Sequence, residues 1–220
     1  CVNSPSASPV NRVEIGDSKE RYAYERNETD EGGIEMKDQK IKTLVSMAFF
    51  TAVTFLGIQA FRIPVPAVVG TPFIHFGHVF VVMGMLLQGG KKGAVTGTAG
   101  LLIFDLLNGY VQSIPQVFVE TIVKCLLVGA LFAWFQRRAG GDRKKEYKGV
   151  VICSILYAIL NILIEWAMGI VGLVVTGSGI GAAVAASTAS IPATIFNAVF
   201  MAVAVSLLYV PVKQIYQKIM

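Results

Sequence analysis

Six apolar segments, separated by short polar stretches, constrain the fold of this chain more than any other feature. A segment needs about 20 mainly apolar residues to cross about 30 Å of hydrocarbon as an α-helix. The six segments cover residues 41–61, 76–87, 93–107, 117–135, 150–175 and 191–209, and some of them are only marginally long enough. We therefore predict an all-α integral membrane protein, a bundle of six transmembrane helices.

The composition agrees with this prediction. Hydrophobic residues make up 54% of the chain and charged residues only 15%, and the mean hydropathy is +0.62. A soluble domain of this size would need more charged surface. The net charge of +5 comes from short clusters of Lys and Arg between apolar segments, without the interleaved aromatic residues of a nucleic-acid-binding face. We expect a lipid bilayer around the chain and no nucleic-acid partner.

The distribution of Lys and Arg predicts the orientation of the bundle. If the N-terminus is cytoplasmic, Arg62 is the only Lys or Arg residue in the outer loops. Positive residues concentrate in cytoplasmic loops, so we predict that both termini are cytoplasmic. The cytoplasmic segments next to the spans then hold Lys37, Lys40, Lys42, Lys91, Lys92, Arg137, Arg138, Arg143, Lys144, Lys145, Lys148, Lys213 and Lys218.

Residues 1–38 are polar and contain few aliphatic side chains. We expect them to form a disordered cytoplasmic tail, followed by a transmembrane domain at 39–220. The tail lacks the apolar core of a secretory signal, and Met36 is a plausible natural start. The three cysteines, Cys1, Cys125 and Cys153, have neither disulfide-framework nor metal-knuckle spacing.

Ionisable and amide side chains inside the apolar segments need an explanation, because each ionisable one costs about 2.5 to 3.5 kcal/mol near mid-membrane. A rise of about 1.5 Å per residue places most of them in the outer half of the bilayer and Lys124 closer to its middle. One interpretation is a binding cavity open to the outside. The other is that Glu120 and Lys124, four residues apart, form a self-contained ion pair while the carboxylates stay hydrated near the headgroups. The set comprises Asp105, Glu120, Lys124, Asn161, Glu165 and Asn197.

Two histidines, His75 and His78, stand three residues apart at the outer start of the second segment. They could face the same way and bind a metal, but two ligands do not make a metal site. Structural or substrate hydrogen bonds are the favoured role, and we expect no bound metal or cofactor.

The sequence contains no Walker, HExxH or GxSxG motif, so we expect no enzymatic activity in this chain. Small residues four apart, which let helices approach closely, occur at Ala48 and Ala52 and at Gly93 and Gly97. For the two glycines we expect packing inside the bundle.

Several short motifs, taken in order, resemble a known family over about residues 36–218. They include Ala48-Phe-Phe-Thr-Ala52, Ile74-His-Phe-Gly77, Gly89-Gly-Lys-Lys-Gly93, Asp105-Leu-Leu-Asn-Gly-Tyr110 and Ile191-Pro-Ala-Thr-Ile-Phe-Asn197. In this order and spacing they resemble the substrate-binding S components of energy-coupling factor (ECF) vitamin transporters, of the riboflavin type.

The resemblance implies a six-helix subunit in a prokaryotic plasma membrane that captures a vitamin or vitamin precursor at the outer face for ATP-driven uptake. Its partners would be a transmembrane T component and two ABC-type ATPase subunits. Ala48 and Ala52 match the AxxxA surface that docks on the T component in that family. The substrate stays open among riboflavin, a pyridoxine-type compound and a thiamin precursor. The predicted substrate-binding residues are His78, Asp105, Asn108, Glu120, Lys124, Asn161, Glu165 and Asn197.

Two other functions are weighed against this one. A stand-alone secondary transporter would couple uptake to ions through Asp105, Glu120 or Glu165, but six spans without an evident inverted repeat disfavour it. A non-transporting scaffold would leave the polar cluster unexplained.

Overall fold

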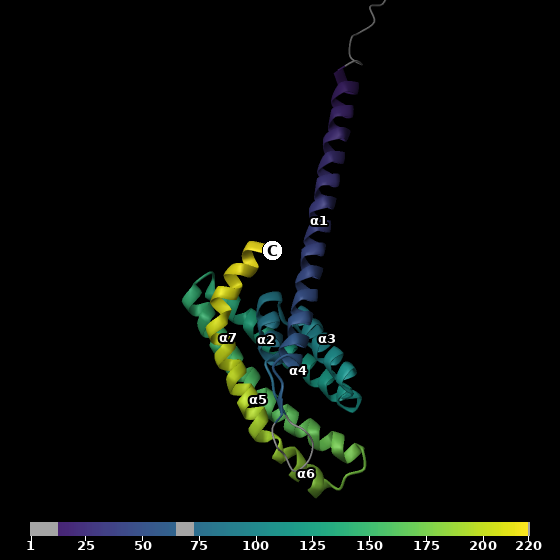
Figure 1. The fold of residues 1–220 in the computed structure, drawn as a ribbon. Helices are drawn as coiled ribbons and strands as arrows, with labels where there is room; N and C mark the ends of the chain where they lie inside the picture. Colours follow the sequence, from purple (N-terminus) through teal and green to yellow (C-terminus); the bar gives the residue numbers. More distant parts are fainter. Residues whose placement is uncertain (1–12, 65–72, 220) are drawn as a thin grey trace, which may run out of the picture. The chain divides into compact units, whose positions relative to one another are not determined.

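The computed structural model describes the backbone of residues 13–64 and 73–219, and the side chains of these ranges from residue 36 onward. Within these residues the chain is mostly helical (Figure 1). It divides into two compact units, residues 1–44 and residues 45–220. The second unit contains the last part of helix α1, from Val45 to Gln59, together with all the other helices and both strands.

The described residues form seven α-helices, one short 3-10 helix and one pair of two-residue strands. The helices are α1 (Val13–Gln59), α2 (Gly77–Gln88), α3 (Gly90–Asn108), α4 (Ile114–Ala139), α5 (Arg143–Val175), α6 (Ile180–Ala189) and α7 (Ile191–Ile219), with the 3-10 helix η1 at Val111–Ser113. The strands β1 (Ile63–Pro64) and β2 (Phe73–Ile74) pair antiparallel.

Each of the six predicted segments coincides with a helix, but not all of these helices are long. Four are long and apolar enough to cross a membrane: α1 from Met36, the stretch Val111–Ala139, α5 and α7. Helix α2 has only 12 residues, about 18 Å of rise, and α6 is shorter still. The chain is thus a mainly helical protein with four candidate membrane spans, and the count of six spans remains a prediction.

The predicted disordered tail differs from the structure where the two can be compared. Residues 1–12 lie outside the described part, and from Val13 the backbone is already helical as the start of α1. Glu, Lys and Arg are frequent in this stretch, and they are good helix formers even without apolar surface to bury. A low apolar content therefore did not exclude a helix here.

Helices α2 and α3 form a tight hairpin that depends on glycine. Gly89, between them, has φ of +89°, a conformation that residues with a Cβ rarely adopt. A Cβ at Gly93 would overlap Met85, and one at Gly97 would overlap Val81. The expected role of these two glycines in packing inside the bundle is confirmed.

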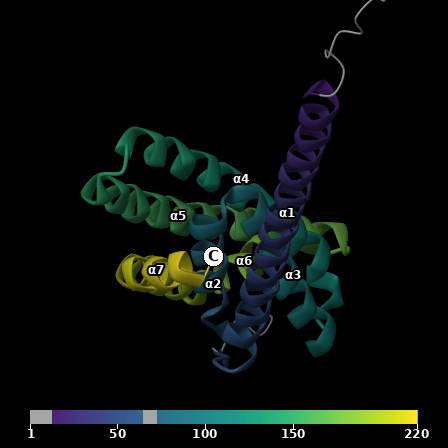
Figure 2. The same cartoon turned by 90° about the horizontal axis from the view of Figure 1, so that it is seen from above.

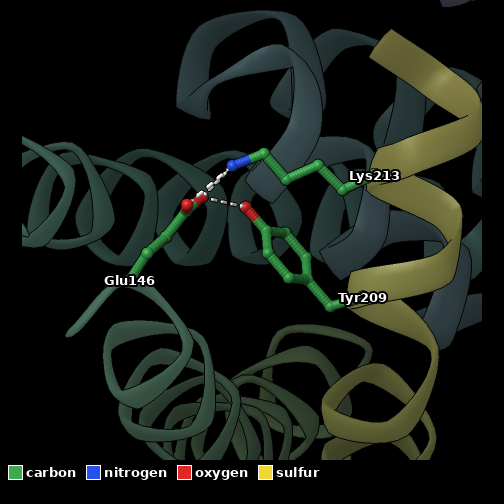
Figure 3. Close-up of polar contacts among 3 residues, drawn as sticks. All are labelled: Glu146, Tyr209 and Lys213. Carbon is green, nitrogen blue, oxygen red and sulfur yellow. Dashed lines mark hydrogen bonds and ion pairs between the residues drawn. The ribbon is translucent and has the colours of Figure 1, made fainter. Parts of the chain in front are cut away.

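Helix α5 lies between α4 and α7 and packs against both (Figure 2). Near the start of α5, Glu146 accepts hydrogen bonds from Lys213 at 2.5 and 2.6 Å and from the Tyr209 hydroxyl at 2.6 Å, both on α7 (Figure 3). This contact joins the first turns of α5 to the end of α7. At the other end of α5, helix α6 packs against α5 and α7.

Many large apolar side chains point outward from the second unit. On α5 they recur every three or four residues, which is the period of one helix face. Such a stripe would be unfavourable in water and suits contact with lipid tails. On α5 these side chains are Ile152, Ile155, Ile159 and Leu163.

Candidate functional site

A cavity of about 530 Å³ lies inside the second unit. Its wall is built by the last turns of α1, α3 and α5, the first turns of α2 and α4, and by β2, η1 and α6. Pockets that hold small organic molecules have volumes of about 300 to 1,000 Å³. The cavity is therefore large enough for a vitamin-sized ligand.

Four of the predicted site residues line this cavity: His78, Asp105, Glu120 and Glu165. They come from α2, α3, α4 and α5, so the fold brings together residues that are up to 87 positions apart in the sequence. Asp105 and Glu120 are 7% and 6% exposed. One carboxylate oxygen of each, Oδ2 of Asp105 and Oε2 of Glu120, is buried and has no hydrogen-bond partner among the described residues.

Two further predicted residues, Lys124 and Asn161, lie behind the cavity wall. Lys124 is fully buried, and its ammonium donates to Oδ1 of Asn161 at 2.7 Å. The Asn161 amide donates in turn to Oε2 of Glu165 at 3.1 Å, and Lys124 Nζ lies 3.8 Å from Oε1 of Glu120. Lys124 and Asn161 thus link two carboxylates of the cavity wall, while neither of them lines the cavity.

Asn197, on α7, also does not line the cavity. Its side-chain oxygen accepts from the backbone N–H of His75 at 3.0 Å, and its amide donates to the carbonyl of Phe73 at 3.0 Å. The Asn197 side chain therefore satisfies one backbone N–H and one backbone carbonyl at β2, as the backbone of an adjacent strand would. Because Phe73 and His75 both line the cavity, Asn197 positions part of its wall.

Asn108 is the predicted site residue that lies outside this arrangement. Its amide donates to Oε1 of Gln59 and to the carbonyl of Phe104, both at 2.9 Å. Its side-chain oxygen accepts from Arg62 at 3.4 Å. These contacts fix the ends of α1 and α3 to each other.

The histidine rings of His75 and His78 lie 5.0 Å apart and both line the cavity. Packing removes His75 largely from water, and this, with a smaller effect from the Lys124 charge, lowers the pKa of His75 to about 4. The neutral ring accepts a hydrogen bond at Nδ1 from the Gly77 N–H at 3.2 Å. Among the described residues, no third His, Cys, Asp or Glu joins the pair in a metal-binding group.

Three aromatic residues of the cavity wall, Phe73, Phe104 and Tyr110, were not predicted as site residues. Their ring centroids lie 5.8 to 6.1 Å apart, and the rings of Phe104 and Tyr110 are stacked. The Arg62 guanidinium lies 5.7 and 5.6 Å from the rings of Phe73 and Phe104. Aromatic residues are frequent near the membrane–water interface, so the sequence did not mark these three as site residues.

Polar residues from the loops and short helices complete the wall, and sequence reasoning did not assign them either. Gln112 and Gln116 come from the start of the α4 region, and Thr176, Ser187 and Ser190 from the α5–α7 connection. This connection, residues 176–190, is rich in small residues. Its middle forms α6, and Ser187 Oγ is buried without a hydrogen-bond partner in the described part of the chain.

Ala48 and Ala52 belong to a different surface. Both side chains are exposed on α1, as are Val45, Phe49 and Leu56 beside them. These five residues form an apolar stripe on α1 with small side chains at its centre.

Comparison with known proteins identifies the family. The family model described as "ECF-type riboflavin transporter, S component" matches residues 38–216. A search of curated proteins found no match to the chain.

Proposed function

Because the chain belongs to the family of ECF-type riboflavin transporter S components, we propose that it captures a heteroaromatic vitamin of the riboflavin kind. The site of capture is the cavity between α2, α3, α4 and α5. As a member of this family, the chain is a vitamin-binding subunit and not an enzyme. The bound vitamin is then delivered inward by an ATP-driven complex. Riboflavin is the first substrate to test, because it is the vitamin named in the family description.

The composition of the cavity wall carries this proposal. One part of the wall offers the stacked rings of Phe104 and Tyr110 together with Phe73. Another part offers buried polar atoms without partners among the described residues: Nδ1 of His78, Oδ2 of Asp105, Oε2 of Glu120 and Oγ of Ser187. Flat aromatic surface facing oriented polar groups suits a planar ring system with polar edges.

The partners are a T component and two ABC-type ATPases. The apolar stripe of α1 around Ala48 and Ala52 supports this proposal, because small side chains allow another helix to approach closely. This chain would contribute ligand binding, and the ATPases would supply the energy.

The membrane orientation follows from charge. With both termini in the cytoplasm of a prokaryotic cell, the residues that follow α4, with Arg137 and Arg138 in its last turn, face inward. The first two turns of α4, with Gln116 and Glu120, then lie toward the outer face. The cavity would open to the outside, where the vitamin is captured.

Two measurements test the proposal. The protein is purified in detergent from cells grown with riboflavin, and the released small molecules are identified by mass spectrometry; a vitamin is expected. A pull-down from native membranes is expected to recover a T component and ATPases. A secondary transporter would bring down neither, and an empty protein that binds no vitamin on titration would contradict the proposed function.

A further inference from the structure

The cavity wall carries an unbalanced set of charged groups. Asp105, Glu120 and Glu165 all line the cavity, and we refer to these three carboxylates as the acidic wall. Glu120 is close enough to interact electrostatically with both of the others. Among the described residues that line the cavity, none is a Lys or an Arg.

Lys124, the one Lys or Arg that is buried among the described residues, is already engaged by the protein. Lys124 donates to Asn161 at 2.7 Å and lies 3.8 Å from Glu120. It does not line the cavity, and its side chain is fully buried. Lys124 therefore offsets one negative charge from behind and presents no ammonium to a ligand.

The free positions of the acidic wall are hydrogen-bond acceptors. Oδ2 of Asp105 and Oε2 of Glu120 have no hydrogen-bond partner among the described residues, and both side chains are more than nine-tenths buried. Each of these oxygens can accept a hydrogen bond when its carboxyl group is ionised. A ligand N–H or O–H group would then satisfy it.

From this arrangement we infer that the acidic wall selects the charge of the ligand: the cavity takes a neutral or cationic vitamin that presents hydrogen-bond donors, and excludes phosphorylated or carboxylated forms. This inference rests on the proposed function and narrows its substrate class. A phosphate near three carboxylates would place like charges together beside partly or fully buried side chains, where repulsion is screened less than in bulk water. Ring N–H groups, hydroxyls and protonated amines would each pair with a carboxylate instead.

The test compares two probes that share a ring system, riboflavin and its phosphate ester, flavin mononucleotide. Both are titrated into the detergent-solubilised, ligand-free protein. We expect riboflavin to bind at least about a hundredfold more tightly, because juxtaposed like charges in an interface are strongly unfavourable. Equal or tighter binding of flavin mononucleotide would overturn the inference and leave the proposed function intact. If neither flavin binds, the neutral and phosphorylated forms of pyridoxine are compared in the same way.

Variants separate repulsion by charge from exclusion by size. Glu120→Gln and Glu165→Gln remove a negative charge and keep nearly the same shape, so each should narrow the ratio of the two affinities by about tenfold. Glu146→Gln is the matched control, because Glu146 does not line the cavity, and it should leave the ratio unchanged. A ratio that stays the same in all three variants would show that size excludes the phosphate, and the inference would then be wrong. A protein that binds none of these vitamins in either form would contradict the proposed function itself.

Discussion

The ammonium of Lys124 donates a hydrogen bond to the side-chain oxygen of Asn161 across 2.7 Å, and both side chains are almost completely buried. This contact joins α4 to α5 behind the cavity. Through Asn161 it also orients Glu165, and through the 3.8 Å approach of Lys124 to Oε1 it orients Glu120. The two interpretations of the sequence, an ion pair and a cavity, therefore describe neighbouring parts of one arrangement.

Replacing Lys124 alone is expected to destabilise the protein. In Lys124→Met the carboxylate of Glu120 stays buried without its cation, and breaking such a pair costs about 3 to 5 kcal/mol in free energy of unfolding. The double variant Lys124→Met, Glu120→Gln should recover most of that loss. Denaturant unfolding of the detergent-solubilised protein measures both.

Ligand affinity in the same double variant tests the role of Glu120. Loss of one charged hydrogen bond to the ligand, about 1.5 to 3 kcal/mol, would weaken binding roughly ten- to a hundredfold. If the stable double variant binds like the wild type, Glu120 and Lys124 have no part in ligand binding.

Asn197 is predicted to act on binding through the backbone of β2. Asn197→Asp keeps the acceptor for the His75 N–H but turns a carboxylate oxygen toward the Phe73 carbonyl, where the amide now donates. We expect about 1 to 3 kcal/mol of lost stability and about tenfold weaker binding, because Phe73 and His75 would shift. Titration and unfolding are measured on the same preparation.

A control for Asn197 is available on the same helix. Among the described residues, the Ser206 hydroxyl donates to the carbonyl of Ala202, one turn earlier in α7, and to no other group. Ser206→Ala should therefore change neither affinity nor stability by much. Unchanged ligand affinity in a folded Asn197→Asp protein would show that the β2 contact has no effect on the cavity.

The three-residue contact in Figure 3 is predicted to stabilise the fold without affecting ligand binding. Lys213 and Glu146 are 26% and 14% exposed at their side chains, so solvent screens the pair only in part. A double-mutant cycle with Glu146→Gln and Lys213→Met should give a coupling free energy of about 1 to 3 kcal/mol. Tyr209→Phe should cost about 1.5 kcal/mol, the lower end for a hydrogen bond to a charged group. A coupling near zero would mean that this contact does not stabilise the fold.

The positions of the helices could be predicted from the sequence because hydrophobicity along the chain is a local property. The predicted span 150–175 lies within α5, for example, and the span 191–209 lies within α7. Where the sequence pattern was weaker, the prediction missed an element: α6 forms in a segment of small residues for which no helix was predicted. The antiparallel strands β1 and β2 gave no local signal, since each contains only two residues.

The site was only partly predictable for a related reason. Buried charge is visible in a sequence, so Asp105, Glu120 and Glu165 could be selected before the structure. What could not be read is how far along a helix the cavity extends. Lys124 follows Glu120 by one helical turn, yet Glu120 lines the cavity and Lys124 does not. Aromatic residues such as Phe104 are too common in membrane helices to stand out, and only the tertiary fold brings Phe104 beside Phe73.

The last prediction concerns the exposed stripe of α1. A Trp at position 48 or 52 would project a large ring where the proposed T component must approach a small side chain, so Ala48→Trp and Ala52→Trp should abolish vitamin uptake in cells. Neither alanine lines the cavity, so the purified variants should bind ligand with wild-type affinity. Val203→Trp, at an exposed apolar position on α7, is the matched control and should leave both uptake and binding unchanged. Uptake that survives both alanine substitutions would show that this stripe is not the docking surface. Loss of uptake in Val203→Trp as well would point to a general effect of bulk in the membrane.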